Sequence, residues 1–531
     1  MQNKTRVYRY FFLIGFLLTF LIIPFHLEMV SDSKSRWKET RWMLTGEDPG
    51  GQLPGRNGSM HFDFGPGHSF MMLPPDWLVL KARPLFEDTY WYQRNSDQIE
   101  FLAVSILIFP VINGLFLLLS FLLLRILGLN CGEAMWGCLS LVFSSTALWY
   151  FQNNQENTAQ YLWTVTSLFS IIKWTKTKKD RWLWLGFFCL GFNMLIRITT
   201  VVNFAFMAAF PIVHAFLVKR DQHVTGMHFP VRKYVLKCLF IGGPIFLFFI
   251  GLDRFWHWLR FGHADGNYID VWTSTMRVQY PWLSSNFPFD APFLEGFLGP
   301  LFSPGKSIFL YNPLFFMVIG LALFCWKKMG VTWQAYFITC LGLMLILLAG
   351  HAKFFMWGGN ESWGTRYSTV PSHMLILVAI PLTMKIFSIK NPLKHKFLSL
   401  FLGFVFFLQV ASLVLPCWVE AHQLKSEGTI VNARPEHGRP AFPFNVNNAF
   451  FMGKRFKNIA DQIFINQDKS QTQSQTPLWM LLPMAKLETI PHKLSLMIKA
   501  LWWGLFFALL RLLFVTAKKC TDADKTYEEE V

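Results

Sequence analysis

Long apolar runs alternate with short polar connections along most of this 531-residue chain. A helix needs about 20 largely apolar residues to cross the hydrocarbon core of a bilayer, and by that measure we predict about twelve spans. They cover residues 10–25, 101–126, 135–150, 161–174, 182–196, 201–217, 235–252, 308–326, 333–349, 370–387, 398–418 and 496–515. The predicted fold class is an all-α polytopic membrane protein with folded loops on its outer face.

The composition agrees with this prediction. The chain is 53% hydrophobic and 15% charged, which is too apolar for an ordinary soluble protein of this length. Its net charge of +17 is spread over short clusters between the apolar runs, so we expect no nucleic-acid partner. Lys4, Arg6 and Arg9 precede the first run, as in a signal peptide. No small-residue cleavage site follows, so we expect a retained first span.

The basic connections predict the orientation of the chain. With the N-terminus in the cytoplasm, the Lys- and Arg-rich connections all lie inside, as the positive-inside rule requires. They are residues 173–181, 219–237, 327–328, 385–396 and 518–519. Both termini are then cytoplasmic. The long mixed segments lie on the outer face, and they are residues 28–100, 253–306, 351–367 and 419–493.

The cysteines predict neither disulfides nor a zinc site. All eight are scattered, most of them within apolar runs, and they show no Cys-x-x-Cys or Cys/His ligand spacing. No other ligand cluster stands out. We therefore predict no metal site and no cofactor, while a requirement for a divalent metal stays open.

The first outer segment carries two groups of polar residues. Asp32 lies just beyond the first span, where neighbouring cations keep its carboxylate ionised, so it suits a general base or an interfacial helix cap. Asp63 and His68 flank a Gly65-Pro66-Gly67 sequence. Two glycines let backbone N–H groups approach a ligand closely, although a plain turn before an interfacial helix explains the same sequence.

Charged residues recur where later outer segments meet the membrane. The cations are Arg197, Arg260, Lys306 and Arg366, and further polar or aromatic residues on this face are Glu156, Trp357 and Glu361. Taken singly, each is explained by snorkelling to lipid headgroups, by helix packing or by an aromatic belt. Together, cations and carboxylates at one depth suit a lipid-linked phosphate held at the membrane surface while a group is transferred from it.

These motifs resemble the GT-C superfamily of polyprenyl-phosphate-sugar-dependent glycosyltransferases, in the branch of protein O-mannosyltransferases and the lipid A aminoarabinose transferase. The resemblance covers residues 10–418. It rests on Asp32 with Arg36-Trp37, the GPG segment at 65–73, LIRITT, WLRFG, LFSPGKSIFLYNP and WGGNESWGTRY. It implies a GT-C-like transmembrane catalytic core at 1–418, an outer-face region at 419–495, and a last transmembrane helix with a cytoplasmic tail at 496–531.

The resemblance also implies an activity. A polyprenyl-phosphate-linked sugar is the expected donor, the acceptor is a lipid, a glycan or a protein, and the transfer is inverting. Asp32 takes the catalytic role. The expected donor phosphate ligands are Lys306, Arg366, Arg260 and Arg197, and the expected substrate contacts are Asp63, His68, Glu156, Trp357 and Glu361. We expect a multi-pass protein of the bacterial inner membrane, in contact with membrane lipids, whose site faces the periplasm.

Two other functions stay open. One is a transporter or flippase of lipid-linked intermediates, against which the predicted spans show few midplane charges and no obvious pair of broken helices. The other is a non-catalytic member of the same fold. It is favoured by two departures from the family pattern: Ser33-Lys34 stand where paired acidic residues are common, and Asp63 replaces a lysine before the GPG segment.

Overall fold

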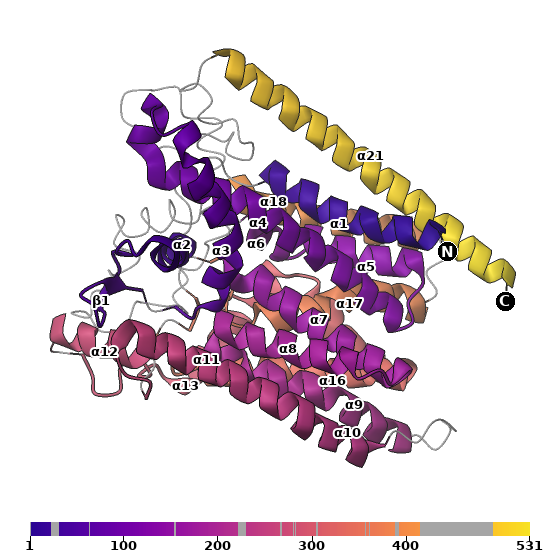
Figure 1. Ribbon diagram of the computed structural model, residues 1–531. Helices are drawn as coiled ribbons and strands as arrows, with labels where there is room; N and C mark the ends of the chain where they lie inside the picture. The colour runs from indigo at the N-terminus through magenta and orange to yellow at the C-terminus, as the bar shows by residue number, and fades with distance from the viewer. Residues whose placement is uncertain are drawn as a thin grey trace.

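The computed structural model describes most of the chain and is almost wholly helical (Figure 1). It describes residues 2–22, 31–62, 64–152, 155–220, 230–265, 268–279, 281, 283–303, 306–355, 357–359, 362–387, 392–414 and 492–530. The predicted outer region at 419–495 lies almost entirely outside the described residues, as do Asp63 and Glu361.

The described elements follow one another along the chain. In the first half they are α1 (Gln2–Ile22), α2 (Ser31–Thr45), β1 (Leu53–Pro54), β2 (Met60–His61), α3 (Gly67–Ala82), η1 (Arg83–Leu85), α4 (Tyr90–Ile126), α5 (Cys131–Phe143), α6 (Ala147–Gln152), α7 (Glu156–Thr177), α8 (Arg181–Ile196), η2 (Ile198–Thr200) and α9 (Val201–Arg220). In the second half they are α10 (Val231–Lys237), η3 (Cys238–Gly242), α11 (Gly243–Phe261), α12 (Tyr268–Gln279), α13 (Phe293–Phe302), α14 (Ile308–Tyr311), α15 (Phe315–Phe324), η4 (Trp326–Lys328), α16 (Val331–His351), α17 (Thr369–Phe387), α18 (Pro392–Val414) and α21 (His492–Glu530). The β1 and β2 strands pair antiparallel, so the first outer segment holds a two-stranded sheet that the all-α prediction did not include.

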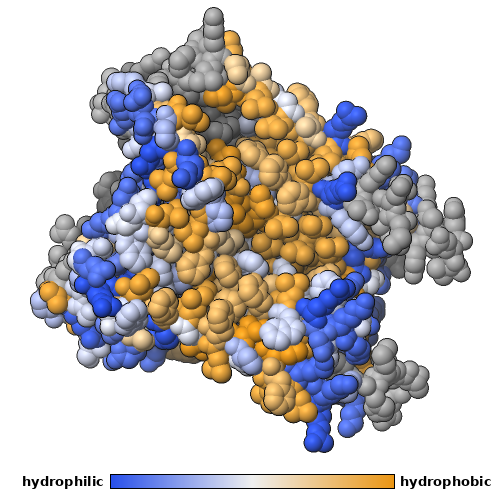
Figure 2. All heavy atoms as spheres, in the orientation of Figure 1, coloured by the Kyte–Doolittle hydropathy of each residue, from blue (hydrophilic) through white to orange (hydrophobic). Residues whose placement is uncertain are grey.

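Six described helices are long and apolar enough to cross a membrane, which confirms an integral membrane protein. They are Ser96–Ile126, Ile198–Arg220, Val231–Phe261, Val331–His351, Thr369–Phe387 and Leu496–Asp524. Shorter apolar helices stand beside them, and the total of about twelve spans stays a prediction. Figure 2 shows an apolar band across the molecule, with hydrophilic side chains gathered at its two ends.

The two ends of this bundle carry different elements. The N-terminal end of α1 and the C-terminal end of α21 lie at the right of Figure 1, whereas α2, β1 and α12 lie at the opposite end. The termini therefore share one end of the bundle, as the positive-inside pattern predicted, and the folded outer segments occupy the other. Which end is cytoplasmic stays a prediction.

Two of the predicted spans are interrupted. The run at 135–150 divides into α5 and α6, and the run at 308–326 divides into α14 and α15 at Asn312-Pro313. Proline has no backbone N–H to donate within a helix. The two breaks meet, because the backbone N–H of Thr146 donates to Asn312 Oδ1 at 2.8 Å. The expectation of no broken helix pair was therefore wrong.

The outer segments are more helical than the sequence predicted. The segment expected to leave the membrane at residue 253 continues as α11 to Phe261, where Gly262 ends the helix at a φ of 83°. Arg260 thus lies on the last helical turn and not in a loop. The first outer segment likewise forms α2, α3 and the beginning of α4.

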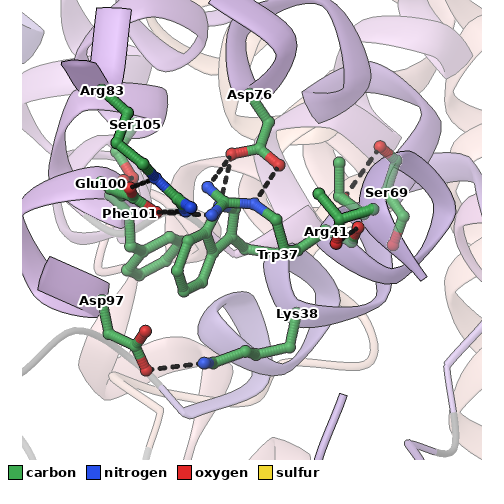
Figure 3. A network of polar contacts seen from close by, with 12 residues as sticks. Trp37, Lys38, Arg41, Ser69, Asp76, Arg83, Asp97, Glu100, Phe101 and Ser105 are labelled. Atoms are coloured by element: carbon green, nitrogen blue, oxygen red, sulfur yellow. Dashed lines mark hydrogen bonds and ion pairs between the residues drawn. The ribbon is translucent and has the colours of Figure 1, made fainter. Parts of the chain in front are cut away.

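A buried ionic network joins these outer helices (Figure 3). The Arg41 guanidinium on α2 donates to both oxygens of Asp76 on α3, at 3.0 and 2.7 Å, and to Glu100 on α4 at 2.5 Å. Trp37 Nε1 donates to Asp76 at 2.9 Å, and Arg83 donates to Glu100 at 2.8 Å. Removing one member of such a network leaves a buried charge unpaired. The network therefore fixes α2, which carries Asp32, against the membrane helices.

Candidate functional site

A second ionic cluster lies at the outer end of the bundle, where four segments meet. Its centre is Glu156, the first residue of α7. Arg36 Nη1 on α2 lies 3.0 Å from one carboxylate oxygen of Glu156, and Arg197 Nη1, which follows α8, lies 3.3 Å from the other. Glu156 is only 1% exposed. A buried carboxylate held between two guanidinium groups is a fixed part of the site and not a solvated surface charge.

The electrostatics of Glu156 follow from these neighbours. Burial by itself raises the pKa of Glu156, but the positive charges of Arg36, Arg366 and Arg197 lower it, and the net result is a pKa well below the ordinary value. Glu156 lies before the predicted span at 161–174, at the outer end of the bundle. Its carboxylate is therefore ionised at neutral pH and holds the arginines together.

Arg366 brings a second carboxylate into the same cluster. Its Nη1 lies 2.7 Å from Asp32 Oδ2, on the first turn of α2. Both side chains are partly exposed, at 17% and 24%, in contrast to Glu156. The cluster of Asp32, Arg36, Glu156, Arg197 and Arg366, which we term the arginine cluster, holds three guanidinium groups and two carboxylates. It carries one net positive charge, with its accessible part at Asp32 and Arg366.

Two donors in the arginine cluster have no acceptor among the described residues. Arg36 Nε and Arg366 Nε are buried without a hydrogen-bond partner in that part of the chain. Buried guanidinium nitrogens in folded proteins are nearly always hydrogen-bonded. Both nitrogens can therefore donate to an acceptor outside the described residues.

The Gly65-Pro66-Gly67 sequence explains how Arg197 is positioned. A Cβ added to Gly65 would lie 2.4 Å from the carbonyl oxygen of Leu195, and one added to Gly67 would lie 2.5 Å from the backbone nitrogen of Ile196. Only glycine permits this backbone-to-backbone approach. The GPG sequence thus packs against the end of α8, directly before Arg197, and the close approach predicted for a ligand is made to the protein's own backbone.

Lys306 binds the backbone of the segment that carries Arg366. Its ammonium is 3% exposed and donates to the carbonyl oxygens of Ser362 and Gly364, at 2.6 and 3.4 Å. Trp357, in the same segment, packs its ring against Gly299 of α13. Lys306 is therefore buried, and its ammonium binds backbone carbonyls two and four residues before Arg366.

The segment that carries Arg366 also contacts the interrupted helices. Trp363 Nε1 donates to Gln409 Oε1 at 3.2 Å, and Gln409 Nε2 donates to the carbonyl oxygen of Tyr311 at 2.8 Å, beside the α14–α15 break. Gly364 adopts a φ of 75° and packs against Tyr311 and Thr146. Lys306, Gln409 and the two breaks thus place Arg366 at the mouth of the bundle.

Two predicted residues lie away from the arginine cluster. Arg260 is 2% exposed, and its guanidinium donates to the carbonyl oxygens of Phe62 and Phe64 at 2.7 and 3.0 Å, which ties α11 to the segment before the GPG sequence. His68 is 1% exposed and stacks on Phe109, with ring centroids 5.6 Å apart.

The sequence predictions missed three members of the site. Arg36 was treated only as a neighbour of Asp32, although their spacing of four residues places them on one face of a helix. His351, at the end of α16, and Tyr367 were not proposed at all. Their rings stack with centroids 4.3 Å apart, and the Arg197 guanidinium lies 4.5 Å from the Tyr367 ring centroid. Among the described residues no group of three or more His, Cys, Asp or Glu is arranged to hold a metal ion.

Comparison with known proteins adds one structural similarity. No protein-family model matches the chain, and no curated protein matches it. Among solved structures the chain is similar to the crystal structure of ArnT from Cupriavidus metallidurans bound to undecaprenyl phosphate. The alignment covers 98% of this chain and 77% of that chain, at 12% sequence identity and a TM-score of 0.38. Because values this low do not carry a fold or an activity from one chain to another, we infer function from the side chains.

Proposed function

We propose that this protein is a membrane glycosyltransferase that takes a sugar from a polyprenyl-phosphate donor at the outer end of the bundle. The observation that supports it is the arginine cluster. Three guanidinium groups from distant segments gather around two carboxylates with one net positive charge, and two of their buried nitrogens have no acceptor among the described residues. Planar guanidinium groups bind phosphate oxygens in pairs.

The position of the cluster favours a lipid phosphate over a soluble one. Arg197 follows the short apolar helix α8, and Arg366 precedes α17, which is long and apolar enough to cross a membrane. An anion bound there has hydrocarbon beside it for a polyprenyl chain. In the proposal Arg366 and Arg197 contact the phosphate. Lys306 and Arg260 act through the backbone carbonyls they bind, and they place the segments that carry the ligands. The predicted substrate contacts Asp63, His68, Trp357 and Glu361 stay predictions.

Asp32 is the proposed base. Its carboxylate is accessible and adjacent to Arg366, and when the donor phosphate binds Arg366 the carboxylate is freed for the acceptor. The acceptor hydroxyl gives its proton to Asp32 as its oxygen bonds to the anomeric carbon of the sugar. The bond from that carbon to the phosphate oxygen breaks, and its electron pair leaves with polyprenyl phosphate. Attack opposite the leaving group inverts the anomeric centre.

A transporter of lipid-linked intermediates is the second candidate, and the interrupted helices favour it. Broken helices at a repeat interface are typical of transporter binding sites. Here, however, the atoms at the breaks bind protein partners, such as Thr146 to Asn312 and Gln409 to Tyr311. These contacts occupy the Thr146 N–H and the Tyr311 carbonyl at the breaks, and they support the segment of Arg366.

The two candidates are distinguished in proteoliposomes that carry a polyprenyl-phosphate donor with a labelled sugar. An enzyme separates the label from the carrier, and the product is either free sugar or a glycoside of an added acceptor. A transporter moves the intact donor between leaflets and leaves its sugar–phosphate bond unbroken. Intact donor after prolonged incubation, with or without translocation, contradicts the proposed enzyme.

A further inference from the structure

His351 is a titratable group beside the arginine cluster that the proposed reaction does not use. It is the last residue of α16 and is half-buried. Its Nδ1 lies 2.9 Å from the carbonyl oxygen of Leu347, one helical turn earlier. A carbonyl oxygen only accepts hydrogen bonds, so Nδ1 carries the proton in the neutral ring. This contact fixes the tautomer and leaves the lone pair on Nε2.

The ring is held in place on its other faces. It stacks on Tyr367 with an interplanar angle of 6°. Tyr367 directly follows Arg366, and the Tyr367 ring also receives the Arg197 guanidinium. His351 is close enough for the charges of both Arg197 and Arg366 to act on it. Among the described residues, the hydrogen bond of the imidazole is that between Nδ1 and Leu347, and Nε2 has no hydrogen-bond partner.

The charged groups around His351 disfavour its protonation while the site holds no anion. The charges of Arg197 and Arg366 act on His351, and their paired carboxylates, Glu156 and Asp32, already compensate charges of the cluster. Two further charged groups belong to the segments near His351. Glu295 is the acidic residue of α13, which packs against Ala352, and Lys353 follows the end of α16 by two residues. An imidazolium there adds a second net positive charge to a cluster that already carries one.

A bound phosphate reverses this balance. Neutral Nε2 is an acceptor, and the ionised oxygens of a phosphate are also acceptors, so the two make a hydrogen bond only when a proton lies between them. The negative charge of the phosphate offsets Arg197 and Arg366 and favours that proton. We propose that His351 Nε2 is a proton-dependent contact to the donor phosphate, so that this site binds a phosphate ester together with one proton. This inference rests on the proposed function.

The test is calorimetry of the full-length protein in detergent with farnesyl phosphate, a short-chain polyprenyl phosphate. Titrations at pH 6 in buffers with different ionisation enthalpies give the number of protons bound per ligand. His351→Phe keeps the aromatic stack on Tyr367 but removes both nitrogens. His351→Asn is the second variant, since its amide can still donate to Leu347. The ionisation of the free ligand is the same in every titration, so it cancels when wild type and variant are compared.

We expect wild type to take up about half a proton or more beyond either variant. By linkage, its affinity then falls about threefold more per pH unit as the pH rises. Equal proton numbers and parallel pH dependences in a variant that binds overturn the role of His351 and leave the proposed phosphate site standing. Absence of farnesyl phosphate binding to wild type overturns both. If His351→Phe fails to fold, the comparison is made with His351→Asn alone.

Discussion

The guanidinium of Arg366 lies 2.7 Å from the carboxylate of Asp32, and this ion pair joins residues 334 positions apart in the chain. It brings the first turn of α2 to the segment that precedes α17. In our proposal the same pair connects two steps, because a phosphate that binds Arg366 releases the carboxylate that serves the acceptor. The two residues should therefore respond differently to substitution.

Asp32→Asn should separate binding from turnover. Removal of a general base typically lowers a rate by ~10² to 10⁴. Polyprenyl phosphate should bind at least as tightly as to wild type, because the substitution removes a negative charge from the cluster. Donor consumption and equilibrium binding are measured on the same preparation. If Asp32→Asn turns over at the wild-type rate, the base is another residue, and Glu361→Gln and Asp63→Asn are the next variants to assay.

Glu156→Gln should destabilise the fold and change its response to acid. Loss of one partner from a buried ionic cluster costs about 3–5 kcal/mol, measurable as thermal unfolding in detergent. The pKa of Glu156 is lower in the folded protein than its ordinary value of 4.5. Its contribution to stability is therefore present above about pH 4.5 and is lost as the pH falls below it, so wild type should lose stability there more steeply than Glu156→Gln.

Asp97→Asn is the matched control for that comparison. Asp97 also pairs with a cation, Lys38, but it is 50% exposed. Exposed ion pairs contribute about 0–1 kcal/mol. An unfolding temperature for Glu156→Gln no lower than that of Asp97→Asn contradicts a structural role for the Glu156 carboxylate.

Gly67→Ala should disturb the site without touching a charged residue. The added Cβ has only 2.5 Å to the backbone nitrogen of Ile196, so α3 and the end of α8 must separate, and Arg197 moves with them. Overpacking of this kind costs about 1–3 kcal/mol. Gly251→Ala is the control, because an added Cβ there meets no atom within 4 Å. Equal farnesyl phosphate affinities in the two variants contradict the positioning role of the GPG sequence.

The predicted topology is tested by labelling single cysteines in a cysteine-free background with an impermeant thiol reagent. Glu47→Cys on the outer segment should react in intact cells, whereas Lys176→Cys should react only after permeabilisation. Gly51 and Gly359 also lie in predicted outer segments, but a cysteine at either position would disturb the fold, because an added Cβ meets His61 at 2.0 Å and Arg366 at 2.7 Å. Labelling of Lys176→Cys from outside intact cells overturns the orientation.

The membrane class was predictable from the sequence because apolar runs of helical length have few alternatives. The interruptions were not predicted, since hydropathy stays high across 135–150 and 308–326, although Asn312-Pro313 was a visible breaker. Asp32, Glu156, Arg197 and Arg366 could be proposed from residue type and from their place at span ends. Their pairing could not, because contacts between distant segments depend on how the helices pack.

Arg260 and Lys306 illustrate the same limit. Each is a cation at the end of an apolar run, and residue type alone does not tell a ligand from a cation that binds backbone carbonyls. In the structure Arg260 donates to the carbonyls of Phe62 and Phe64, and Lys306 donates to the carbonyls of Ser362 and Gly364 and to the Ser362 hydroxyl. His351 was not proposed from the sequence, because a single histidine at a helix end carries no sequence signal for a site. The structure places it beside the arginine cluster.

Equilibrium binding of undecaprenyl phosphate to the protein in nanodiscs tests the central claim, that the arginine cluster holds a lipid phosphate. A charge-assisted contact to phosphate contributes roughly 1.5–3 kcal/mol, so Arg366→Ala should bind about ten- to a hundredfold more weakly than wild type. Arg366→Lys should recover only part of the loss, because a lysine lacks the guanidinium fork, and Lys38→Ala on α2 should bind as wild type. Wild-type affinity in Arg366→Ala, or an equal loss in Lys38→Ala, contradicts the account.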